Sequence, residues 1–548
     1  MASPPNAAIG FAADGFQTDR TRLMGRHVAG DGFLRGLIRH GGLDRLSAYL
    51  LAPGDGPVFE QLARKAGATM ALEAIAPQRL DRLAAIGTLM LPGPEVAQLA
   101  RARRFAGSTA YSVVGVTHTT ASHGAMESIA DLLAGPAEPW DALICTSRAV
   151  AATARSLLEA EAAQLRDRLG AQRFPLPMLP VIPLGVDCAA FAPPPGARAS
   201  WRARLGIAED TVVVLSLGRL SWHAKAHPVA LFGALGRAAR RPGAPRLHCV
   251  LAGWFAHGEQ EEAHRAMAAA LAPEVGLSIV DARAAEARQG LHAMADVFSL
   301  LVDNIQETYG LAPVEAMAAG LPVVVSDWDG FKDTVRHGED GFRVPSLMAP
   351  PGSAADLALR HAAGAMNYDN YLGASTQLVA LDIAAGAEAF FALATNAELR
   401  RRMGAAGQAR ALQHFDWRVV IGQYQALWAA LAERRRAATP GPRAIDPRHA
   451  DPTEGFASYP SAALAGEMRV AADPEACSSI EALAALPGGI YRPAGGLAEA
   501  GLAGMLHRLQ QEGPTTIAAL LPEEGRAAAL RGLLWLLKSG FVRRLPPA

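Results

Sequence analysis

One strand–helix–strand pattern constrains the fold of this chain more than any other segment. Val297–Val302 is a short apolar run typical of a buried parallel strand, and a polar turn follows it. Ala312–Ala319 is predicted to be a short helix that ends at Gly320. Pro322 prevents its continuation, and the apolar run Val323–Val325 is the next buried strand. Two parallel strands joined by a helix predict an open α/β sheet, whose ligands bind beyond the carboxyl ends of the strands.

The turn between this strand and helix is the predicted binding site. Glu307 lies on the turn and Glu315 lies in the first helical turn, with seven residues between them. The free N–H groups of Leu311 and Ala312 would face the same crevice and suit a phosphate. Because carboxylates accept hydrogen bonds from a sugar diol, a phosphate site beside them indicates a nucleotide sugar. As isolated residues, the two glutamates could instead be a solvated loop residue and a partner of the helix dipole.

Length and composition are those of a globular protein with more than one domain. The 548 residues exceed what a single core usually holds, 50% of them are hydrophobic, and the formal net charge is +0. A balanced charge gives little bulk attraction to nucleic acid. The 4 scattered cysteines have no CxxC spacing, which argues against a disulfide framework and a structural zinc site. No signal peptide or membrane-spanning run is apparent, so we expect a cytoplasmic protein, with a peripheral position at the inner membrane as an alternative.

The stretch from Asp303 to Phe342 resembles a known family. It is similar to the E-x7-E signature of retaining glycosyltransferases with the GT-B fold (glycosyltransferase family 4), which include sucrose synthase and many bacterial mannosyl- and glucosyltransferases. The matching residues are Glu307, Gly310, Leu311, Glu315, Ala316, Gly320, Pro322, Val323 and the Asp340-Gly341 turn. The resemblance implies an α/β protein with two Rossmann-like doubly wound domains facing across a cleft. It also implies retaining transfer of a hexose from a UDP-, GDP- or ADP-sugar to a hydroxyl of a glycan, lipid or small-molecule acceptor.

Residues 1–188 are predicted to form the N-terminal, acceptor-side domain, because short apolar runs alternate with helical segments. The candidate strands are Ala8–Ala12, Ala48–Leu51, Thr69–Leu72, Ile86–Leu91, Ser112–Thr117, Leu143–Thr146 and Leu179–Pro183. Gly25, Gly30 and Gly32 predict a tight turn with close backbone approach to a ligand, before a helix over Phe33–Arg39. Glycine loops at this place in the family lie beside the acceptor, and a turn without ligand contact is an equal alternative.

Two further features of this domain carry polar side chains. His118 follows a predicted strand and should stand at its end in the crevice, where it resembles the histidine of the family near the donor sugar. A lone histidine is otherwise more often structural. Arg101, Arg103 and Arg104 lie on one predicted helix. A solvated face is the ordinary interpretation of such a cluster, and contact with an acidic acceptor or a membrane surface is the alternative.

The second domain, residues 189–416, is predicted to bind the nucleotide sugar. Its candidate strands are Val212–Ser216, Leu247–Gly253, Leu277–Asp281, Val297–Val302 and Val323–Val325. After the first of these come Gly218, Arg219 and Lys225, and a glycine turn with two cations suits a diphosphate. An exposed basic loop is the ordinary alternative. The element resembles the GRL…K element of the family, although Ala226 stands where the family usually has a glycine.

The resemblance also implies roles for these residues. The donor-binding candidates are Gly218, Arg219, Lys225, Glu307, Tyr309, Gly310, Leu311 and Glu315. The catalytic candidates are His118, Arg219, Lys225 and Glu307. Glu315 would hold the nucleotide ribose, and Glu307 would contact the hexose and the phosphates. Arg219 and Lys225 would stabilise the diphosphate leaving group, and His118 would contact the donor sugar from the opposite domain.

No cofactor and no metal is expected. Asp327 and Asp329 form a D-x-D element, which holds a divalent metal in glycosyltransferases of the other major fold. Here the two residues directly follow a strand and precede Gly330, so a turn is the favoured interpretation. We therefore expect a nucleotide sugar as the donor substrate and transfer that does not depend on a metal.

Two segments depart from the pattern of the family. Met348–Asp382 is an insertion with clustered aromatic and amide side chains, which suit either sugar contacts or a packed loop. After a helix over 417–436 that completes the first domain, residues 437–460 are predicted to be a linker. Residues 461–548 resemble a winged helix. Its predicted elements are the helices Leu497–Glu512, Thr516–Leu521 and Gly525–Lys538 and the strand Gly540–Leu545. Because this segment is not markedly basic, docking of a protein partner or homo-oligomerisation is favoured over DNA binding.

Two alternative functions stay open. A GT-B sugar phosphorylase would use free phosphate in place of a nucleotide. A non-catalytic GT-B protein would carry the winged-helix segment as an interaction or DNA-binding module. The presence of Arg219, Lys225, Glu307 and Glu315 together favours the transferase.

Overall fold

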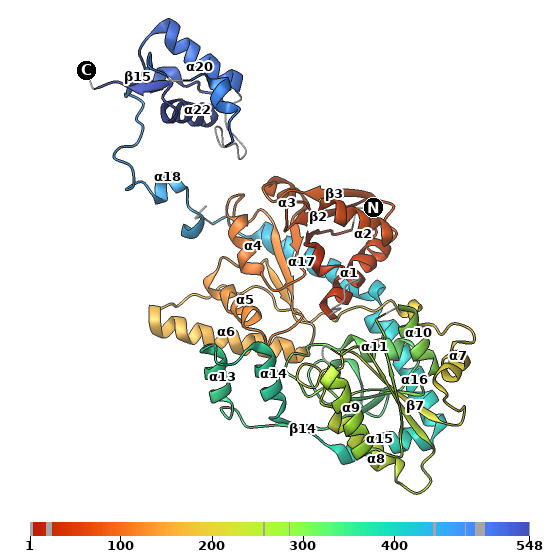
Figure 1. The fold of residues 1–548 in the computed structure, drawn as a ribbon. Helices are drawn as coiled ribbons and strands as arrows, with labels where there is room; N and C mark the ends of the chain where they lie inside the picture. The colour runs from red at the N-terminus through yellow and green to blue at the C-terminus, as the bar shows by residue number, and fades with distance from the viewer. Residues whose placement is uncertain are drawn as a thin grey trace. The chain divides into compact units, whose positions relative to one another are not determined.

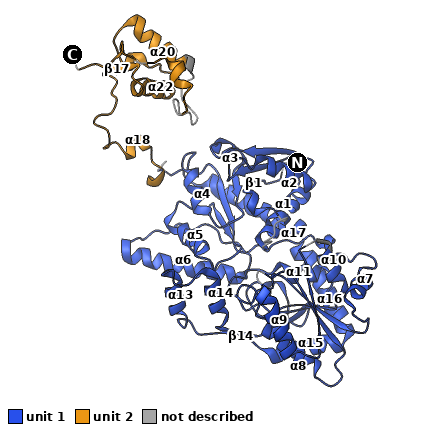
Figure 2. Cartoon of the chain, viewed as in Figure 1, with its two compact units in different colours: residues 1–446 blue, residues 447–548 orange. Residues whose placement is uncertain are grey.

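The computed structural model describes residues 4–17, 25–255, 258–283, 285–441, 445–476, 478–487 and 499–546. The chain divides into two compact units, 1–446 and 447–548 (Figure 2). The first unit contains two six-stranded sheets with helices around them (Figure 1). The second unit contains helices and a short three-stranded sheet.

The first sheet is parallel throughout and has the strand order β3-β2-β1-β4-β5-β6. Its strands are β1 (Ala8–Phe11), β2 (Arg45–Leu50), β3 (Ala71–Ile75), β4 (Thr88–Met90), β5 (Ser112–Val116) and β6 (Ala142–Ile144). The helices are α1 (Gly25–His40), α2 (Gly56–Lys65), α3 (Leu80–Ile86), α4 (Val96–Arg103), α5 (His123–Ala134) and α6 (Arg148–Leu169). The strand order is that of a Rossmann domain, as predicted. The prediction of a strand over Leu179–Pro183 is wrong, because this segment makes only an isolated bridge between Val181 and Cys145.

The second sheet is also parallel, with the order β12-β11-β10-β7-β8-β9. Its strands are β7 (Val212–Leu217), β8 (Leu247–Ala252), β9 (Gly276–Val280), β10 (Val297–Leu300), β11 (Val323–Ser326) and β12 (Gly341–Val344). The helices around it are α7 (Ala197–Leu205), α8 (Pro228–Ala239), α9 (Gly258–Leu271), α10 (Ala285–Met294), α11 (Leu311–Ala318), α12 (Phe331–Thr334), α15 (Ile383–Thr395) and α16 (Ala397–Arg410). Strand β12 was not predicted. It starts at Gly341, where a Cβ would lie 2.0 Å from the carbonyl oxygen of Val323, so only glycine fits beside β11.

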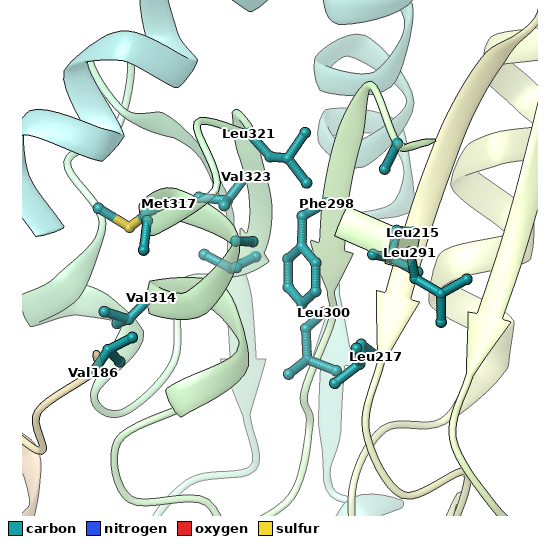
Figure 3. Packing of buried hydrophobic residues seen from close by; sticks show 14 of the residues in the cluster. Val186, Leu215, Leu217, Leu291, Phe298, Leu300, Val314, Met317, Leu321 and Val323 are labelled. Atoms are coloured by element: carbon teal, nitrogen blue, oxygen red, sulfur yellow. The ribbon is translucent and has the colours of Figure 1, made fainter. Parts of the chain in front are cut away.

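Helix α11 packs on the second sheet through a short apolar face. Val314 and Met317, three residues apart on the helix, belong to the same buried cluster as Phe298 of β10 and Val323 of β11, and Figure 3 shows Val314 beside Val186. The four side chains from α11, β10 and β11 are fully buried. Each such burial contributes about 1.5–3 kcal/mol. This packing fixes the N-terminal end of α11 beyond the carboxyl end of β10, where the predicted binding turn lies.

The chain passes between the two domains twice, and the two passages lie side by side. Val186 donates its N–H to the carbonyl of Phe415 at 2.8 Å and accepts the N–H of Trp417 at 3.1 Å. Helix α17 (Trp417–Ala437) then returns onto the first domain, as predicted. Its buried side chains are Trp417, Val420, Ile421, Tyr424, Leu427, Trp428 and Leu431. The first domain is therefore completed by a helix that follows the second domain in the sequence.

Helix α1 begins at Gly25, earlier than predicted, so the expected tight turn around Gly30 and Gly32 is wrong. Both glycines lie inside the helix, because α1 packs very closely on its neighbours. A Cβ on Gly30 would lie 2.2 Å from the carbonyl oxygen of Gly15. A Cβ on Gly32 would lie 3.1 Å from the ring of Trp417. These two glycines serve helix packing and do not form a loop.

The arginines of α4 are paired, so their interpretation as a solvated face is wrong. Arg103 is fully buried and forms a double hydrogen bond with the buried carboxylate of Asp141, with the longer Nη2–Oδ2 distance at 2.9 Å. Arg101 donates through Nε to Asp446 at 2.9 Å, and Arg104 is also in an ion pair. A buried charge is tolerated only when it is paired in this way. The cluster therefore holds α4 to neighbouring segments of the first domain.

The end of the first unit lies later than the predicted linker start at residue 437. The Gly441 N–H donates to Ser108 Oγ at 3.1 Å, and Asp446 is paired with Arg101. The boundary between the two units follows residue 446. The chain between α17 and this boundary therefore belongs to the first unit.

The second unit has its own hydrophobic core. Its elements are η4 (Pro447–His449), α18 (Pro452–Gly455), β15 (Arg469–Ala472), α19 (Ile480–Ala484), α20 (Glu499–Glu512), β16 (Thr515–Thr516), α21 (Ile517–Leu520), α22 (Arg526–Lys538) and β17 (Val542–Arg544). The three predicted helices and the last strand are confirmed, apart from residues 497–498, which lie outside the described part of the chain. Strands β15 and β16 were not predicted, and β15 pairs antiparallel with both β16 and β17. The roles predicted for this unit, docking or homo-oligomerisation, stay predictions.

We expect a protein that ends at Asp446 to stay folded, because the cut removes no side chain from the cores of the first unit and keeps the Arg101 ion pair. A protein that ends at Asp416 should be insoluble, because it lacks α17. Burial of four apolar side chains of α17 alone contributes on the order of 6–12 kcal/mol, comparable to the net stability of a domain. Soluble yield and melting temperature of the two truncated proteins check this. An insoluble 1–446 protein would show that the first unit depends on the second.

Candidate functional site

The predicted site residues converge on one cleft in the first unit. The cleft has a volume of about 410 Å³ and is lined from both Rossmann-like domains. The predicted residues that line it are Gly25, His118, Gly218, Arg219, Lys225, Glu307, Tyr309, Gly310, Leu311 and Glu315. Gly30 lines a separate small cavity, and Gly32 lies under Trp417. Of the predicted acceptor-side glycines, only Gly25 therefore faces the cleft.

Several lining residues were not predicted. They are Arg26, Ser122, Trp254, Arg283 and Gln306 among others. Trp254 and Arg283 follow closely after strands β8 and β9, so the rule that ligands bind beyond the carboxyl ends of parallel strands could have identified them. Tyr368 belongs to the clustered aromatic and amide side chains of the insertion, for which sugar contacts and a packed loop were both open, and it lines the cleft.

An ion pair between Lys225 and Glu307 lies at the centre of the cleft. The Lys225 ammonium donates a hydrogen bond to Glu307 Oε2. Burial by itself raises the pKa of Glu307, but the ammonium and the backbone N–H groups of Thr308 and Tyr309 outweigh burial and hold this pKa below its ordinary value. Glu307 is therefore an ionised carboxylate, and its neighbour Lys225 supplies the balancing charge.

Arg219 lies on the same wall of the cleft and is held by neutral partners. Its Nη2 donates to the side-chain oxygen of Gln306 at 2.8 Å and to the carbonyl of Ala224 at 3.2 Å. No ion pair is formed by Arg219 in the part of the chain that the structure describes. A guanidinium bonded only to neutral oxygens keeps its charge available to an anionic ligand.

His118 reaches the cleft from the first domain, at the end of β5. Burial lowers the pKa of His118 to about 4, although a hydrogen bond with the Pro92 backbone acts in the opposite direction. The imidazole is therefore neutral at pH 7. A neutral imidazole can donate through one ring nitrogen and accept through the other, so it suits a hydroxyl ligand better than a phosphate.

The turn that carries Glu307 is packed too closely for side chains at two glycines. Gly310 has φ +85, in the left-handed region, and a Cβ there would lie 2.0 Å from the ring of Phe331. A Cβ on Gly330 would lie 2.5 Å from the Cα of Tyr309. Gly310 also precedes α11, so the free N–H groups of Leu311 and its neighbours line the cleft. The turn and the helix N-terminus are thus one rigid element.

Contacts across the cleft join this element to the first domain. The Thr308 hydroxyl donates to the carbonyl of His118 at 3.1 Å. Ser147, which caps the N-terminus of α6, donates its hydroxyl to Asp329 Oδ1 at 3.0 Å. Arg148 contacts both carboxylate oxygens of Asp333 at 2.6 Å, through its backbone N–H and its Nε. Two carboxylates of the second domain therefore dock at the N-terminus of a long helix of the first domain, where the helix dipole favours negative charge.

Asp327 and Asp329, the D-x-D pair, point to different partners. Asp327 Oδ1 lies 3.4 Å from Arg343 Nη1, and Asp329 contacts Ser147. Asp329 has φ +37 and occupies a tight turn, as predicted. Among the described residues, no group of three or more His, Cys, Asp and Glu side chains is placed to hold a metal ion. The same described residues contain no helix long and apolar enough to cross a membrane.

Comparison with known proteins identifies the class of the second domain. Residues 197–358 match the family model described as "Glycosyl transferases group 1". This segment contains Gly218, Arg219, Lys225, Glu307 and Glu315, which are the second-domain side of the cleft. Residues 197–358 are thus similar to this family, in agreement with the predicted resemblance.

Curated relatives match only a part of the chain. A D-inositol 3-phosphate glycosyltransferase of Nocardia farcinica is 29% identical over 234 residues, which are 42% of this chain and 50% of the relative. A phosphatidyl-myo-inositol mannosyltransferase of Mycobacterium tuberculosis is 32% identical over 253 residues, which are 46% of this chain and 54% of the relative. The chain therefore spans about half the length of these curated relatives.

Solved structures resemble the chain more loosely. A sucrose-phosphate synthase from Thermosynechococcus elongatus has a TM-score of 0.48 at 17% identity and covers 78% of this chain and 99% of its own. Anabaena HepE in complex with UDP and glucose has a TM-score of 0.47 at 17% identity and covers 73% of this chain and 96% of its own. Both TM-scores lie below 0.5, so the roles of the cleft residues depend on the geometry of this chain.

We predict that Asp329→Asn changes how stability depends on pH. Burial raises the pKa of Asp329 to about 7, and the nearby Glu307 carboxylate adds to the effect. A raised folded-state pKa gives stability that is present below about pH 4 and is lost as the pH rises through about 7. Asn keeps the oxygen that accepts from Ser147 and tolerates the left-handed turn. Relative to wild type, the variant should gain on the order of 2–4 kcal/mol between pH 5 and pH 8.

Melting temperatures of the wild type and the variant at several pH values check this prediction. Asp327→Asn, two residues away, removes a carboxylate from the same segment and is the matched control for the loss of an acidic side chain there. A difference between Asp329→Asn and wild type that stays constant over this pH range would show that Asp329 does not titrate in it.

Proposed function

We propose that this protein is a retaining glycosyltransferase that moves a hexose from a nucleoside diphosphate sugar to an acceptor hydroxyl. The observation that carries the proposal is the convergence of two cations, a helix N-terminus and two carboxylates in one cleft between two Rossmann-like domains. The family match over residues 197–358 supports it, as do the names of the glycosyltransferase and mannosyltransferase relatives. The acceptor is a hydroxyl of a glycan, lipid or small molecule on the side of Gly25.

The diphosphate of the donor lies between Arg219, Lys225 and the N-terminal N–H groups of α11 in this proposal. A diphosphate carries more than one negative charge, so it can replace Glu307 as the partner of Lys225. The released Glu307 carboxylate then accepts hydrogen bonds from hexose hydroxyls. Glu315, in the second turn of α11, accepts from the ribose hydroxyls, and the backbone at Tyr309 and Gly218 bounds the phosphates.

In the transfer step, the acceptor oxygen forms a bond to the anomeric carbon while the bond from that carbon to the diphosphate oxygen breaks. The electron pair of the broken bond leaves with the diphosphate, and the acceptor proton passes to a phosphate oxygen. Attack from the face that the diphosphate leaves would retain the configuration. Arg219 and Lys225 stabilise the charge that grows on the diphosphate. His118, neutral at pH 7, contacts a hydroxyl of the donor sugar.

We expect Arg219→Ala and Lys225→Ala to lower the turnover of the donor by about 10²–10³-fold each, because both cations act on charge that develops in the transition state. Glu315→Gln is the contrast, since a ribose contact holds the donor equally in the ground state and should weaken donor binding more than turnover. The measurement is kcat and donor Kd with UDP-, GDP- and ADP-sugars. Near-normal turnover in both alanine variants would place the diphosphate elsewhere.

We also expect transfer to continue in excess EDTA, because the protein supplies two cations and a helix N-terminus where a metal would otherwise neutralise the diphosphate. The measurement is the rate of transfer after dialysis against EDTA, with and without added Mn²⁺ or Mg²⁺. Activity that disappears with the chelator and returns with the ion would make Asp327 and Asp329 the first residues to test as ligands.

A further inference from the structure

The insertion between β12 and α15 is an ordered helical hairpin. It leaves through β13 (Ser346–Met348), forms α13 (Ala355–Ala362) and α14 (Tyr368–Thr376), and returns through β14 (Val379–Leu381). Strands β13 and β14 pair antiparallel, with Met348 opposite Val379. Figure 1 shows α13 and α14 as a helical pair outside the second sheet. The two ends of the insertion therefore meet, and the sheet of the second domain does not depend on it.

Helix α14 packs into the side of the cleft. Leu372 is fully buried in a small cluster that contains Ala121 of the first domain and Ala224 of the second domain. Ile305, from the segment that leads to Glu307, packs against the same cluster. A Cβ on Gly373 would lie 3.1 Å from the Cβ of His223, so α14 also approaches the loop of Arg219 and Lys225 closely. One helix of the insertion thus contacts three segments that form the cleft.

A chain of two hydrogen bonds connects the insertion to Arg219. The Gln306 Nε2 donates to the hydroxyl of Tyr368 at 3.2 Å, and Gln306 Oε1 accepts from Arg219 Nη2 at 2.8 Å. Tyr368 is half-buried and lines the cleft together with Arg219 and Lys225. The amide of Gln306 is thus bonded at both ends, which fixes its orientation. A fixed amide in turn holds the guanidinium in one place.

We infer that the inserted hairpin is a functional wall of the cleft, and that Tyr368 is a positioning residue that holds Arg219, through Gln306, for an anionic diphosphate. The inference deepens the proposed function and rests on it for the identity of the ligand. The physical reason is entropic: an arginine side chain has several rotatable bonds, and fixing it before the ligand arrives removes that cost from binding.

The test is the affinity for inorganic pyrophosphate, which carries the charge of the leaving group without the sugar or the base. Tyr368→Phe keeps the ring and removes the acceptor of the Gln306 amide, and we expect it to weaken pyrophosphate binding about 2- to 10-fold, the worth of one ordinary hydrogen bond. Tyr371→Phe is the matched control. Tyr371 lies on the same helix but stacks on His361, with ring centroids 4.7 Å apart, and does not line the cleft. Calorimetric titration of the full-length protein gives the Kd values.

A double-mutant comparison shows whether Tyr368 acts through Arg219. In an Arg219→Ala background, adding Tyr368→Phe should change the pyrophosphate Kd no further, because the residue it positions is absent. Equal pyrophosphate Kd values for wild type and Tyr368→Phe would overturn the inference. An effect of Tyr368→Phe that is equally large with and without Arg219→Ala would also overturn it. So would a wild-type protein that does not bind pyrophosphate. Turnover of the nucleotide sugar by the wild type is measured separately. That measurement tests the proposed function and does not bear on the role of Tyr368.

A deletion tests the wall as a whole. Because Ala349 donates its N–H to the Leu378 carbonyl at 2.9 Å, residues 350–377 can be replaced by Asn-Gly, a two-residue hairpin turn. We expect this protein to melt near the wild-type temperature and to bind pyrophosphate at least as weakly as Tyr368→Phe. A folded deletion protein with wild-type affinity would contradict the inference. If the deletion protein does not fold, the point variants decide.

Discussion

The ion pair between Lys225 and Glu307 is the interaction on which the ligand-free cleft depends. Each partner alone would be a charge held out of water, and such a charge is strongly unfavourable unless an opposite charge or hydrogen bonds balance it. Here the carboxylate also accepts from the backbone N–H groups of Thr308 and Tyr309. A ligand that enters this arrangement must replace one of the partners. A neutral ligand cannot replace Glu307 beside Lys225, whereas a diphosphate could, so under the proposed function the ion pair would favour an anionic donor.

The same turn limits how the two domains meet. Because Gly310 and Gly330 have no side chains, the backbone of Tyr309 lies directly against the loop that carries Asp329 and Phe331. Thr308, on the opposite side of this turn, is bonded to the His118 carbonyl of the first domain. A change in the separation of the domains therefore moves the Glu307 carboxylate relative to His118. The turn that carries Glu307 is therefore held to the His118 segment by a direct hydrogen bond, and the backbone around it is closely packed.

Sequence patterns predicted the strands of the two large sheets, apart from β12, and part of the second-domain side of the cleft, because these follow from local rules. Apolar runs mark buried strands, and side chains that follow such strands meet at one edge of a parallel sheet. The errors have a different cause. Gly32 was interpreted as part of a turn because the ring that requires it, Trp417, is distant in the sequence. Arg103 was interpreted as solvated because its carboxylate, Asp141, lies on another element. Partners that come together only in the folded chain leave no local signal.

The insertion illustrates how a cleft can change without a change of fold. Its ends are already paired in the β13–β14 ladder, so the entropy of closing the loop is offset by hydrogen bonds that the insertion itself brings. The second sheet ends at β12 before the insertion begins, and its strand order is unaffected. Tyr368 of α14 lines the cleft, and Leu372 of the same helix is buried in the cluster beside it. A segment attached in this way can alter the shape of the cleft, and the placement of Arg219, while the Rossmann-like domain that presents the charged residues stays the same.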